Sequence, residues 1–282
     1  MTVRIGLADA SDERVIEAAA RLVEQGGITP VLIGAAPGTV PPGAEELTPP
    51  PGESTVDYLA RVLEPAGLAA GVSGSLTTSA AVLRAGIRQL RTADLVCGCF
   101  AIRHHGTWAT YADCVVVPDP DAAQLARIAA AAADHHQALF GTEPRVALLS
   151  FSTSGSAVHP RADKVREATR LLRAARPDLV ADGEIQFDVA VDAGVAARKA
   201  PGSVLAGGAN VLVFPSLEAG NIAYKVAERV GGARALGSFV LGLRRPWADL
   251  SRGCSAGDIA ETAALLAGAA ARTRCGKGIQ AG

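Results

Sequence analysis

The sequence predicts an α/β protein built on mainly parallel strands. Short apolar runs that are typical of strands alternate along the chain with segments whose apolar residues recur at helical spacing. The chain has 282 residues, of which 49% are hydrophobic and 20% are charged, so it can bury one large core or two of moderate size. We therefore expect helices packed on a parallel sheet.

The N-terminal third illustrates this alternation. A first strand ends near Leu7, and Ser11 is placed to cap a helix over residues 12–25, which the pair Gly26-Gly27 ends. The next strand is expected over residues 30–34. Residues 35–53 contain six prolines, which exclude a regular helix or a central strand there.

Further strands are expected at five apolar runs, with helices in the intervals between them. The last helix should follow Ser255 and run through residues 259–271, leaving residues 272–282 as a mobile tail. The five runs are residues 95–102, 114–117, 146–151, 185–187 and 211–215.

The composition argues against several functional classes. A formal net charge of −1 provides no basic field for nucleic acid, and no apolar run is long enough for a membrane span. The N-terminus lacks the basic and long apolar segments of a secretion signal, so we expect a cytoplasmic protein. The five cysteines show neither a disulfide framework nor metal-ligand spacing, and we expect no metal site.

The turn that precedes the last helix is the most informative segment. It places the hydroxyl of Ser251, the guanidinium of Arg252 and the carboxylate of Asp258 within eight residues. The N-terminus of a helix attracts anions, and an arginine can bind phosphate through two parallel hydrogen bonds, so this turn suits a phosphorylated ligand. Taken locally, Ser255 and Asp258 favour a capping box that only starts the helix.

Several ordered motifs carry a resemblance to a known family. Together with the turn at Ser251, they resemble the phosphate acetyltransferase and phosphate butyryltransferase family in order and spacing. The motifs are residues 151–157 (FSTSGSA), 182–188 (DGEIQFD), 199–203 (KAPGS), 209–215 (ANVLVFP) and 218–225 (EAGNIAYK).

This resemblance implies a fold and a reaction. Family members have two α/β domains of the isocitrate/isopropylmalate dehydrogenase-like type with an active-site cleft between them, and they commonly form homodimers. Transferred to this chain, domain one comprises residues 1–93 and 238–282, and domain two comprises residues 94–237. The implied reaction is acyl-CoA + phosphate = acyl phosphate + CoA, with a short acyl group such as acetyl. CoA and acyl-CoA are then substrates, and no bound cofactor is implied.

The resemblance also implies roles for individual residues. Asp258 matches the family's proposed base for the CoA thiol, Arg252 its phosphate-contacting arginine, and Ser251 a serine that hydrogen-bonds the reacting group. Arg84 matches a second arginine near that site, and the resemblance places Asn221 near the ligand. The Ser/Gly loop after an apolar strand suits a phosphate cradle of backbone N–H groups; its residues are Ser152, Thr153, Gly155 and Ser156.

Each of these residues also has a simpler explanation. Arg84 would lie on a solvated helix face, the Ser/Gly loop would be an ordinary turn, and Asn221 would cap a helix over residues 222–230. Cys254 has no histidine near it in sequence, so we expect it to pack or to position the backbone instead of acting as a nucleophile.

The chain departs from the family in three places. A basic segment expected between Thr55 and Gly71 is missing, and only Arg61 remains there. Residues 103–108 (RHHGTW) replace a mostly apolar connection, and in a working enzyme Arg103, His104 or His105 would have to compensate for the missing segment. Trp247 lies beside the turn, where a large aromatic ring would reshape or cover the acyl pocket. These departures leave two alternatives open, an acyltransferase with a different acceptor and a non-catalytic ligand-binding protein.

Overall fold

The computed structural model describes residues 2–277. It has a mixed α/β fold that divides into two compact units, Met1–Val96 with Leu236–Gly282 and Cys97–Ala235. Within the described residues, no helix is both long enough and apolar enough to cross a membrane.

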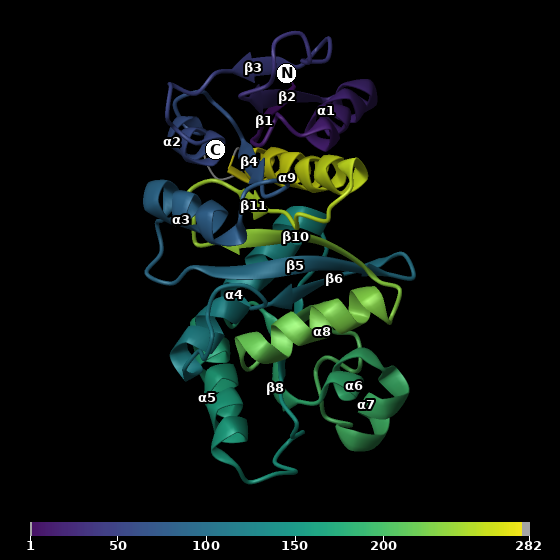
Figure 1. The fold of residues 1–282 in the computed structure, drawn as a ribbon. Coiled ribbons are helices and arrows are strands. Elements are labelled where there is room, and N and C mark those ends of the chain that lie inside the picture. The colour runs from purple at the N-terminus through teal and green to yellow at the C-terminus, as the bar shows by residue number, and fades with distance from the viewer. Residues whose placement is uncertain (1, 278–282) are drawn as a thin grey trace. The chain divides into compact units, whose positions relative to one another are not determined.

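The first unit is a mainly parallel sheet between two pairs of helices. Its strand order is β3-β2-β1-β4-β11-β10, and only β10 and β11 pair antiparallel. Helices α1 and α9 pack against each other, as do α2 and α3 (Figure 1). The strands are β1 (Val3–Leu7), β2 (Ile28–Ile33), β3 (Glu45–Leu47), β4 (Ala70–Ser73), β10 (Arg234–Leu241) and β11 (Trp247–Asp249); the helices are α1 (Glu13–Gln25), α2 (Thr55–Val62), α3 (Ser79–Leu90) and α9 (Ala256–Lys277).

The helix ends of this unit correct two expectations. The N-cap of α1 is Asp12 and not Ser11, because the carboxylate of Asp12 accepts the backbone N–H of Arg14 at 3.0 Å. Gly26 ends α1 as expected, with a φ of 73° that a residue with a side chain rarely adopts. Helix α9 continues to Lys277, so residues 272–277 are helical and do not form a tail, while residues 278–282 lie outside the described part.

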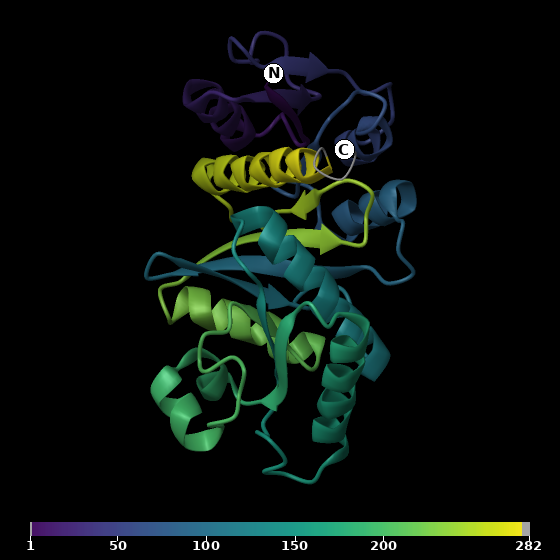
Figure 2. The same ribbon diagram turned by 180° about the vertical axis from the view of Figure 1, so that it is seen from behind.

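The second unit is also a sheet with helices packed on it. Its strand order is β5-β6-β9-β7-β8, with one antiparallel pair, β5 and β6. Helices α4 and α5 lie side by side, as Figure 2 shows. The strands are β5 (Cys97–His104), β6 (Thr107–Ala112), β7 (Arg145–Leu149), β8 (Val180–Ile185) and β9 (Val211–Val213); the helices are α4 (Ala122–Phe140), α5 (Pro160–Ala175), α6 (Phe187–Val191), α7 (Ala193–Lys199) and α8 (Leu217–Arg229).

The strand expected at residues 114–117 is wrong. The strand in this region is β6, which ends just before these residues. It forms a hairpin with β5 through a two-residue turn at His105 and Gly106, both with positive φ. Residues 114–117 form a loop instead, because the buried carboxylate of Asp113 accepts the backbone N–H groups of three successive residues, Val115, Val116 and Val117. These N–H groups are therefore not available to a sheet.

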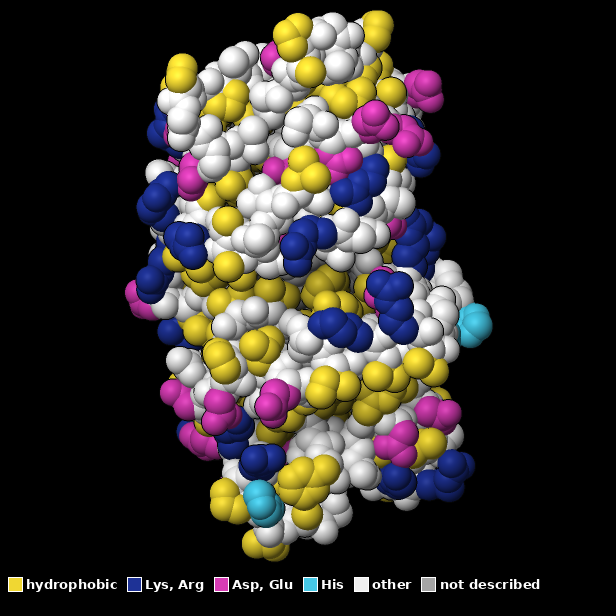
Figure 3. Space-filling model, viewed as in Figure 1, with side chains coloured by type: hydrophobic (Ala, Val, Ile, Leu, Met, Phe, Trp, Pro, Cys, Tyr) yellow, Lys and Arg dark blue, Asp and Glu magenta, His cyan; other side chains and the backbone are white. Residues whose placement is uncertain are grey.

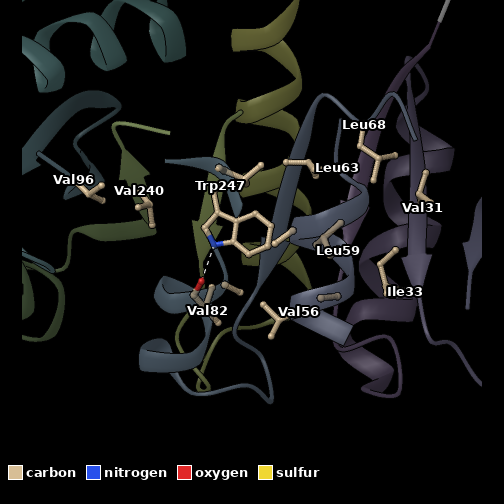
Figure 4. Close-up of a cluster of buried hydrophobic side chains, with 14 residues drawn as sticks. Val31, Ile33, Val56, Leu59, Leu63, Leu68, Val82, Val96, Val240 and Trp247 are labelled. Carbon is tan, nitrogen blue, oxygen red and sulfur yellow. Dashed lines mark hydrogen bonds between the residues drawn. The ribbon is translucent and has the colours of Figure 1, made fainter. Parts of the chain in front are cut away.

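The core between the sheet and helices α2 and α3 is built around Trp247 (Figure 4). The side chain is buried, and its Nε1–H donates to the backbone oxygen of Val82 at 3.2 Å. The ring fits because two neighbouring residues lack side chains: an added Cβ would lie 2.5 Å from the ring at Gly71 and 3.0 Å at Gly86. The expectation that Trp247 shapes or covers an acyl pocket is therefore wrong, since the ring lies inside the core.

Strand β11 ends with a buried carboxylate. Asp249 is 4% exposed, and its Oδ1 has no hydrogen-bond partner among the described residues. Burial raises the pKa of Asp249 to about 6, helped by the nearby charge of Asp9 and opposed by a hydrogen bond with Ser79. At neutral pH, burial of the ionised Asp249 carboxylate therefore lowers the free energy of unfolding of the first unit.

Helix α8 of the second unit exposes an apolar stripe. Ile222, Val226 and Val230, spaced by four residues along α8 and its C-cap, are 61%, 52% and 83% exposed. Hydrophobic side chains follow α8 on the face shown in Figure 3. The stripe is an unusual surface for a helix whose other side packs on a sheet.

A side chain at residue 71 should destabilise the first unit. We expect Gly71→Ala to lower its stability by about 1–3 kcal/mol, because the added methyl group must displace the Trp247 ring. Thermal unfolding followed by tryptophan fluorescence would measure the loss. Gly202→Ala is the control, since nothing lies within 4 Å of its added Cβ; equal unfolding temperatures for the two variants would contradict the packing described.

Stability should depend on pH through Asp249. Since its folded-state pKa of about 6 lies above the ordinary value, the folded state binds the proton more tightly than the unfolded chain does. The contribution of this proton to the free energy of unfolding is fully present below pH ~4 and is lost as the pH rises through 6. Asp249→Asn should therefore stabilise the protein at pH 7.5, by on the order of 2 kcal/mol, and hardly at pH 4. Unfolding curves at both pH values test this; an equal gain at both would argue against it.

Candidate active site

Three loops of the first unit meet at the carboxyl edge of its parallel strands. They follow β1, β4 and β11, which pair up to their carboxyl ends: Leu7 pairs with Val72, and Ser73 with Asp249. The backbone N–H of Leu250 also donates to the oxygen of Ser73 at 2.7 Å. Ligands of open α/β sheets bind at this edge, so functional side chains are expected in these loops.

The turn after β11 carries Ser251 and Arg252 into helix α9. It is closed by hydrogen bonds to Ser251, whose backbone oxygen accepts the N–H of Cys254 at 2.9 Å and whose Oγ accepts the N–H of Gly253 at 3.2 Å. Arg252 is exposed, and its guanidinium has no hydrogen-bond or ion-pair partner among the described residues. A charged guanidinium without a partner, beside a helix N-terminus, is available to an anionic ligand.

Asp258 and Ser255 form a capping box at the start of α9. Oδ2 of Asp258 accepts the backbone N–H of Ser255 at 2.9 Å and its hydroxyl at 2.8 Å, while Ser255 Oγ accepts the N–H of Asp258 at 3.2 Å. The local structural role expected from the sequence is therefore present. It does not remove the carboxylate from the surface, since Asp258 is only partly buried.

Cys254 has a structural role in the same turn. The side chain is buried, and burial raises the pKa of its thiol to about 11, which keeps it protonated and a poor nucleophile at neutral pH. Its backbone oxygen accepts a hydrogen bond from Arg14 at 2.7 Å. The expectation that Cys254 packs and positions the backbone agrees with this arrangement.

The loop between β4 and α3 is organised by a buried carboxylate. Asp9, 4% exposed, accepts the backbone N–H of Gly74 at 2.9 Å and the hydroxyl of Thr77 at 2.6 Å. Sequence reasoning did not single out Asp9; its only sequence signal is its place directly after the first strand. Asp9 therefore fixes the loop that leads into α3, the helix that carries Arg84.

Arg84 lies on the second turn of α3. Its side chain is exposed and has no hydrogen-bond or ion-pair partner among the described residues. Arg88, one turn further along the helix, is by contrast paired with Asp57 at 2.7 Å. Arg61, the one arginine near the missing basic segment, is paired with Glu53 at 2.6 Å. Arg84 and Arg252 are thus two cations of this unit whose guanidiniums have no partner within the described part of the chain.

The Ser/Gly loop after β7 is held by the second unit itself. Glu184, 3% exposed, accepts the Oγ–H of Ser152 at 2.9 Å and the N–H of Gly155 at 2.8 Å. Burial alone would raise the pKa of Glu184, but these hydrogen bonds and one from Arg166 lower it below its ordinary value. Every backbone N–H from residue 152 to 156 has an acceptor within the protein.

The expected phosphate cradle is therefore already occupied. A carboxylate of the protein accepts the N–H group that a ligand phosphate would need, so a ligand could use only the exposed surface of this loop, at residues 154–156. The side chains of Ser152 and Thr153 are buried, and Thr153 Oγ1 accepts the N–H of Gln186 at 2.9 Å. Their first role is to hold the loop.

Asn221 is not a helix cap. The cap of α8 is Ser216, and Asn221 lies in the second turn of that helix. Its Nδ2 donates to the oxygen of Cys114 at 3.1 Å, and its Oδ1 accepts from Lys225 Nζ at 2.6 Å. The side chain thus ties α8 to the loop after β6.

A cavity of about 840 Å³ lies on the second unit and was not expected from the sequence. The segment 199–204, which includes the KAPGS motif, lines it together with Ser154, Arg173 and Asp182. Its cations are compensated: Arg173 pairs with Asp182 and Lys199 with Asp188, both at 2.8 Å. Only the fold brings these motifs together, because they are far apart in sequence.

The residues expected to compensate for the missing segment lie on the β5–β6 hairpin. The guanidinium of Arg103 lies over the Trp108 ring at 5.3 Å, and the rings of His104 and His105 are 4.0 Å apart. Their compensating role stays a prediction. Among the side chains that the structure describes, those of residues 2–272, no group of three or more His, Cys, Asp or Glu could hold a metal ion.

Comparison with known proteins identifies relatives over most of the chain. A model of the family described as "Phosphate acetyl/butaryl transferase" matches residues 57–267. The phosphate acetyltransferase of Paracoccus denitrificans is 40% identical over 93% of each chain. That of Acetivibrio thermocellus is 46% identical over 70% of this chain and 62% of its own length. A phosphotransacetylase structure from Streptococcus pyogenes superposes with a TM-score of 0.87 at 32% identity, over 96% of this chain and 94% of its own.

The family match includes the loop after β4, the Ser/Gly loop and the turn at Ser251. The Paracoccus denitrificans and Streptococcus pyogenes proteins are similar to almost the whole chain, both units included. The chain belongs to the phosphate acetyl/butyryl transferase family.

Proposed function

We propose that this protein exchanges a short acyl group, acetyl, between CoA and phosphate. The observation that carries the proposal is the turn from Ser251 to Asp258, where an unpartnered guanidinium, a hydroxyl and a carboxylate meet at the start of α9. Family membership and the named relatives support the same reaction. The substrates are small molecules: acyl-CoA, acyl phosphate, phosphate and CoA.

In this proposal the two unpartnered arginines bind phosphate. Arg252 contacts the phosphate of the acyl phosphate, Arg84 adds a second positive charge, and Ser251 hydrogen-bonds the reacting group. Charge develops on the carbonyl oxygen and on the departing phosphate during transfer, so fixed cations lower the barrier most when they are held in place beforehand. The exposed part of the Ser/Gly loop and Asn221 remain proposed substrate contacts.

Asp258 is proposed as the base that deprotonates the CoA thiol. A free carboxylic acid and a free thiol differ by about 4–5 pKa units, on the order of 6 kcal/mol, so proton transfer needs help from cations that stabilise the thiolate. Asp258 also keeps its place in the capping box, and the two roles are compatible because the box needs only hydrogen bonds to one oxygen.

Further properties belong to the same proposal. We propose that the two units are of the isocitrate/isopropylmalate dehydrogenase-like type, and that the protein is cytoplasmic and acts without a bound cofactor. We also propose a homodimer, which the exposed apolar stripe of α8 supports, since such stripes are commonly covered by a partner.

The reaction is tested with purified protein, phosphate and a panel of acyl-CoAs, by following the release of free thiol. Phosphate-dependent release that is fastest with acetyl-CoA is expected. Release without phosphate, when other nucleophiles are supplied, would favour a different acceptor. No release at all, beside an active family enzyme in the same buffer, would favour a ligand-binding protein.

Arg84 and Arg88 provide a matched pair on one helix. Arg84→Ala should lower kcat/KM for phosphate by about 10–100-fold, because it removes an uncompensated charge from the site. Arg88→Ala should change it less than about 2-fold, because its guanidinium is already paired with Asp57. Arg252→Ala should lower kcat/KM for phosphate by about 100-fold or more. Equal effects of the two α3 variants would contradict the role of Arg84.

Substitutions of Asp258 and Ser255 distinguish a catalytic role from a helix-capping role. Asp258→Asn keeps an oxygen for the capping box, so it should cost less than about 1 kcal/mol of stability but at least about 100-fold in acetyl transfer. Ser255→Ala should do the reverse, weakening the helix start while leaving the carboxylate. The two variants are compared by thermal unfolding and by turnover; an active Asp258→Asn enzyme would leave Asp258 with capping alone.

A further inference from the structure

Arg14, on the first turn of α1, makes more hydrogen bonds than any cation assigned to substrate. Its NH1 donates to the backbone oxygens of Arg252 at 2.9 Å and Cys254 at 2.7 Å. Its NH2 donates to the backbone oxygen of Ser75 at 3.0 Å and to Asp12 at 2.6 Å. Its Nε also donates to Asp12, at 3.1 Å from each carboxylate oxygen. All five N–H groups of the guanidinium are therefore used.

These contacts distinguish Arg14 from a substrate-binding arginine. Arg252 and Arg84 have guanidiniums without partners among the described residues, whereas a ligand could bind Arg14 only by displacing acceptors that already satisfy it. Asp12 neutralises the charge of Arg14: hydrogen bonds from Arg14 lower the pKa of Asp12, and that ion pair raises the pKa of Arg14. Asp12 is itself the N-cap of α1, so it holds the guanidinium at a fixed place.

The accepted oxygens belong to the turn that carries Arg252 and to the loop that leads into α3, the helix of Arg84. Arg252 and Cys254 flank Gly253, whose surroundings are open: an added Cβ would have no neighbour nearer than 3.8 Å. An exposed turn with a glycine at its centre has many accessible conformations. Two hydrogen bonds that Ser251 accepts within the turn narrow this choice, and two hydrogen bonds from the rigid, planar group of Arg14, on either side of that glycine, narrow it further.

We propose that Arg14 is the positioning residue of the turn Ser251–Ser255. It orients the guanidinium of Arg252 by fixing the backbone that carries it, and through Ser75 it holds this turn at a set distance from the loop after β4. The inference rests on the proposed function for the role of Arg252. Arg14 itself does not contact the substrate; its effect passes through Arg252.

This arrangement explains why a lysine would not suffice. The ammonium group of lysine has three donors around one nitrogen, whereas the guanidinium presents donors on separate nitrogens to Asp12, Ser75 and the two oxygens of the turn. A displacement of about 1 Å in a catalytic group can cost on the order of 100-fold in rate. Arg14→Lys should therefore fold well and still lose much of the activity.

The test is a double-mutant cycle between Arg14→Gln and Arg252→Ala, measured as kcat/KM for phosphate. If Arg14 acts through Arg252, Arg14→Gln should lower the wild-type value by about 10–100-fold and lower that of Arg252→Ala by less than about 3-fold. Arg14→Lys should lose at least about 5-fold. Arg21→Gln is the control on the same helix, because the Arg21 guanidinium pairs with Glu17 on the helix surface, and it should change the value less than about 2-fold.

Hydrogen exchange provides a second measurement that does not depend on activity. Amide exchange in the segment 250–258 should be at least about 10-fold faster in Arg14→Gln than in wild type, and unchanged in Arg21→Gln. Should Arg14→Gln not fold, Arg14→Lys takes its place in both measurements. The proposal would be overturned if Arg14→Gln lowered kcat/KM for phosphate by the same factor in the wild type and in Arg252→Ala. Unchanged amide exchange in residues 250–258 would overturn it as well. An inactive wild type with faster exchange in Arg14→Gln would refute the proposed function but keep the positioning role.

Discussion

The first unit depends on the register between β11 and β4. These strands come from opposite ends of the chain, and their parallel pairing places Asp249 beside Ser73 and Trp247 beside Gly71. The Trp247 ring can lie in the core only because Gly71 and Gly86 have no side chains. A slip of one residue would turn the indole toward the opposite face of the sheet, so this packing fixes which loops face one another at the carboxyl edge.

Once that register is set, the loops at the edge are held by polar groups that follow the first strand. Asp9 binds the loop after β4, and Arg14 joins that loop to the turn after β11. The same unit leaves Arg84 and Arg252 without partners among its described residues. We therefore propose two different roles for the arginines. An arginine with a full set of hydrogen bonds builds the site, whereas one without partners is available to a phosphorylated substrate.

In the second unit, a carboxylate holds the Ser/Gly loop in place. The Ser/Gly loop has the composition of a phosphate-binding loop, yet Glu184 accepts the N–H of Gly155 and the hydroxyl of Ser152 inside it. A negative charge of the protein thus stabilises a loop rich in N–H donors. A ligand could therefore contact only the exposed surface of this loop. The sequence instead predicted that the backbone N–H groups of the loop would bind phosphate directly.

The sequence by itself determined the fold class, the strands β1, β2, β5, β7 and β9, the α9 start with its capping box, and the family, because these depend on local periodicity, cap chemistry and ordered motifs. It reached β8 only at Ile185 and did not predict β3, β4, β10 and β11. It misplaced β6, since the hydrogen bonds that Asp113 makes to residues 115–117 could not be read from an apolar run. It assigned Trp247 to a pocket and overlooked Asp9 and Arg14. Only the tertiary structure decided these points, because whether a ring is buried or a guanidinium is satisfied depends on partners more than 60 residues away along the chain.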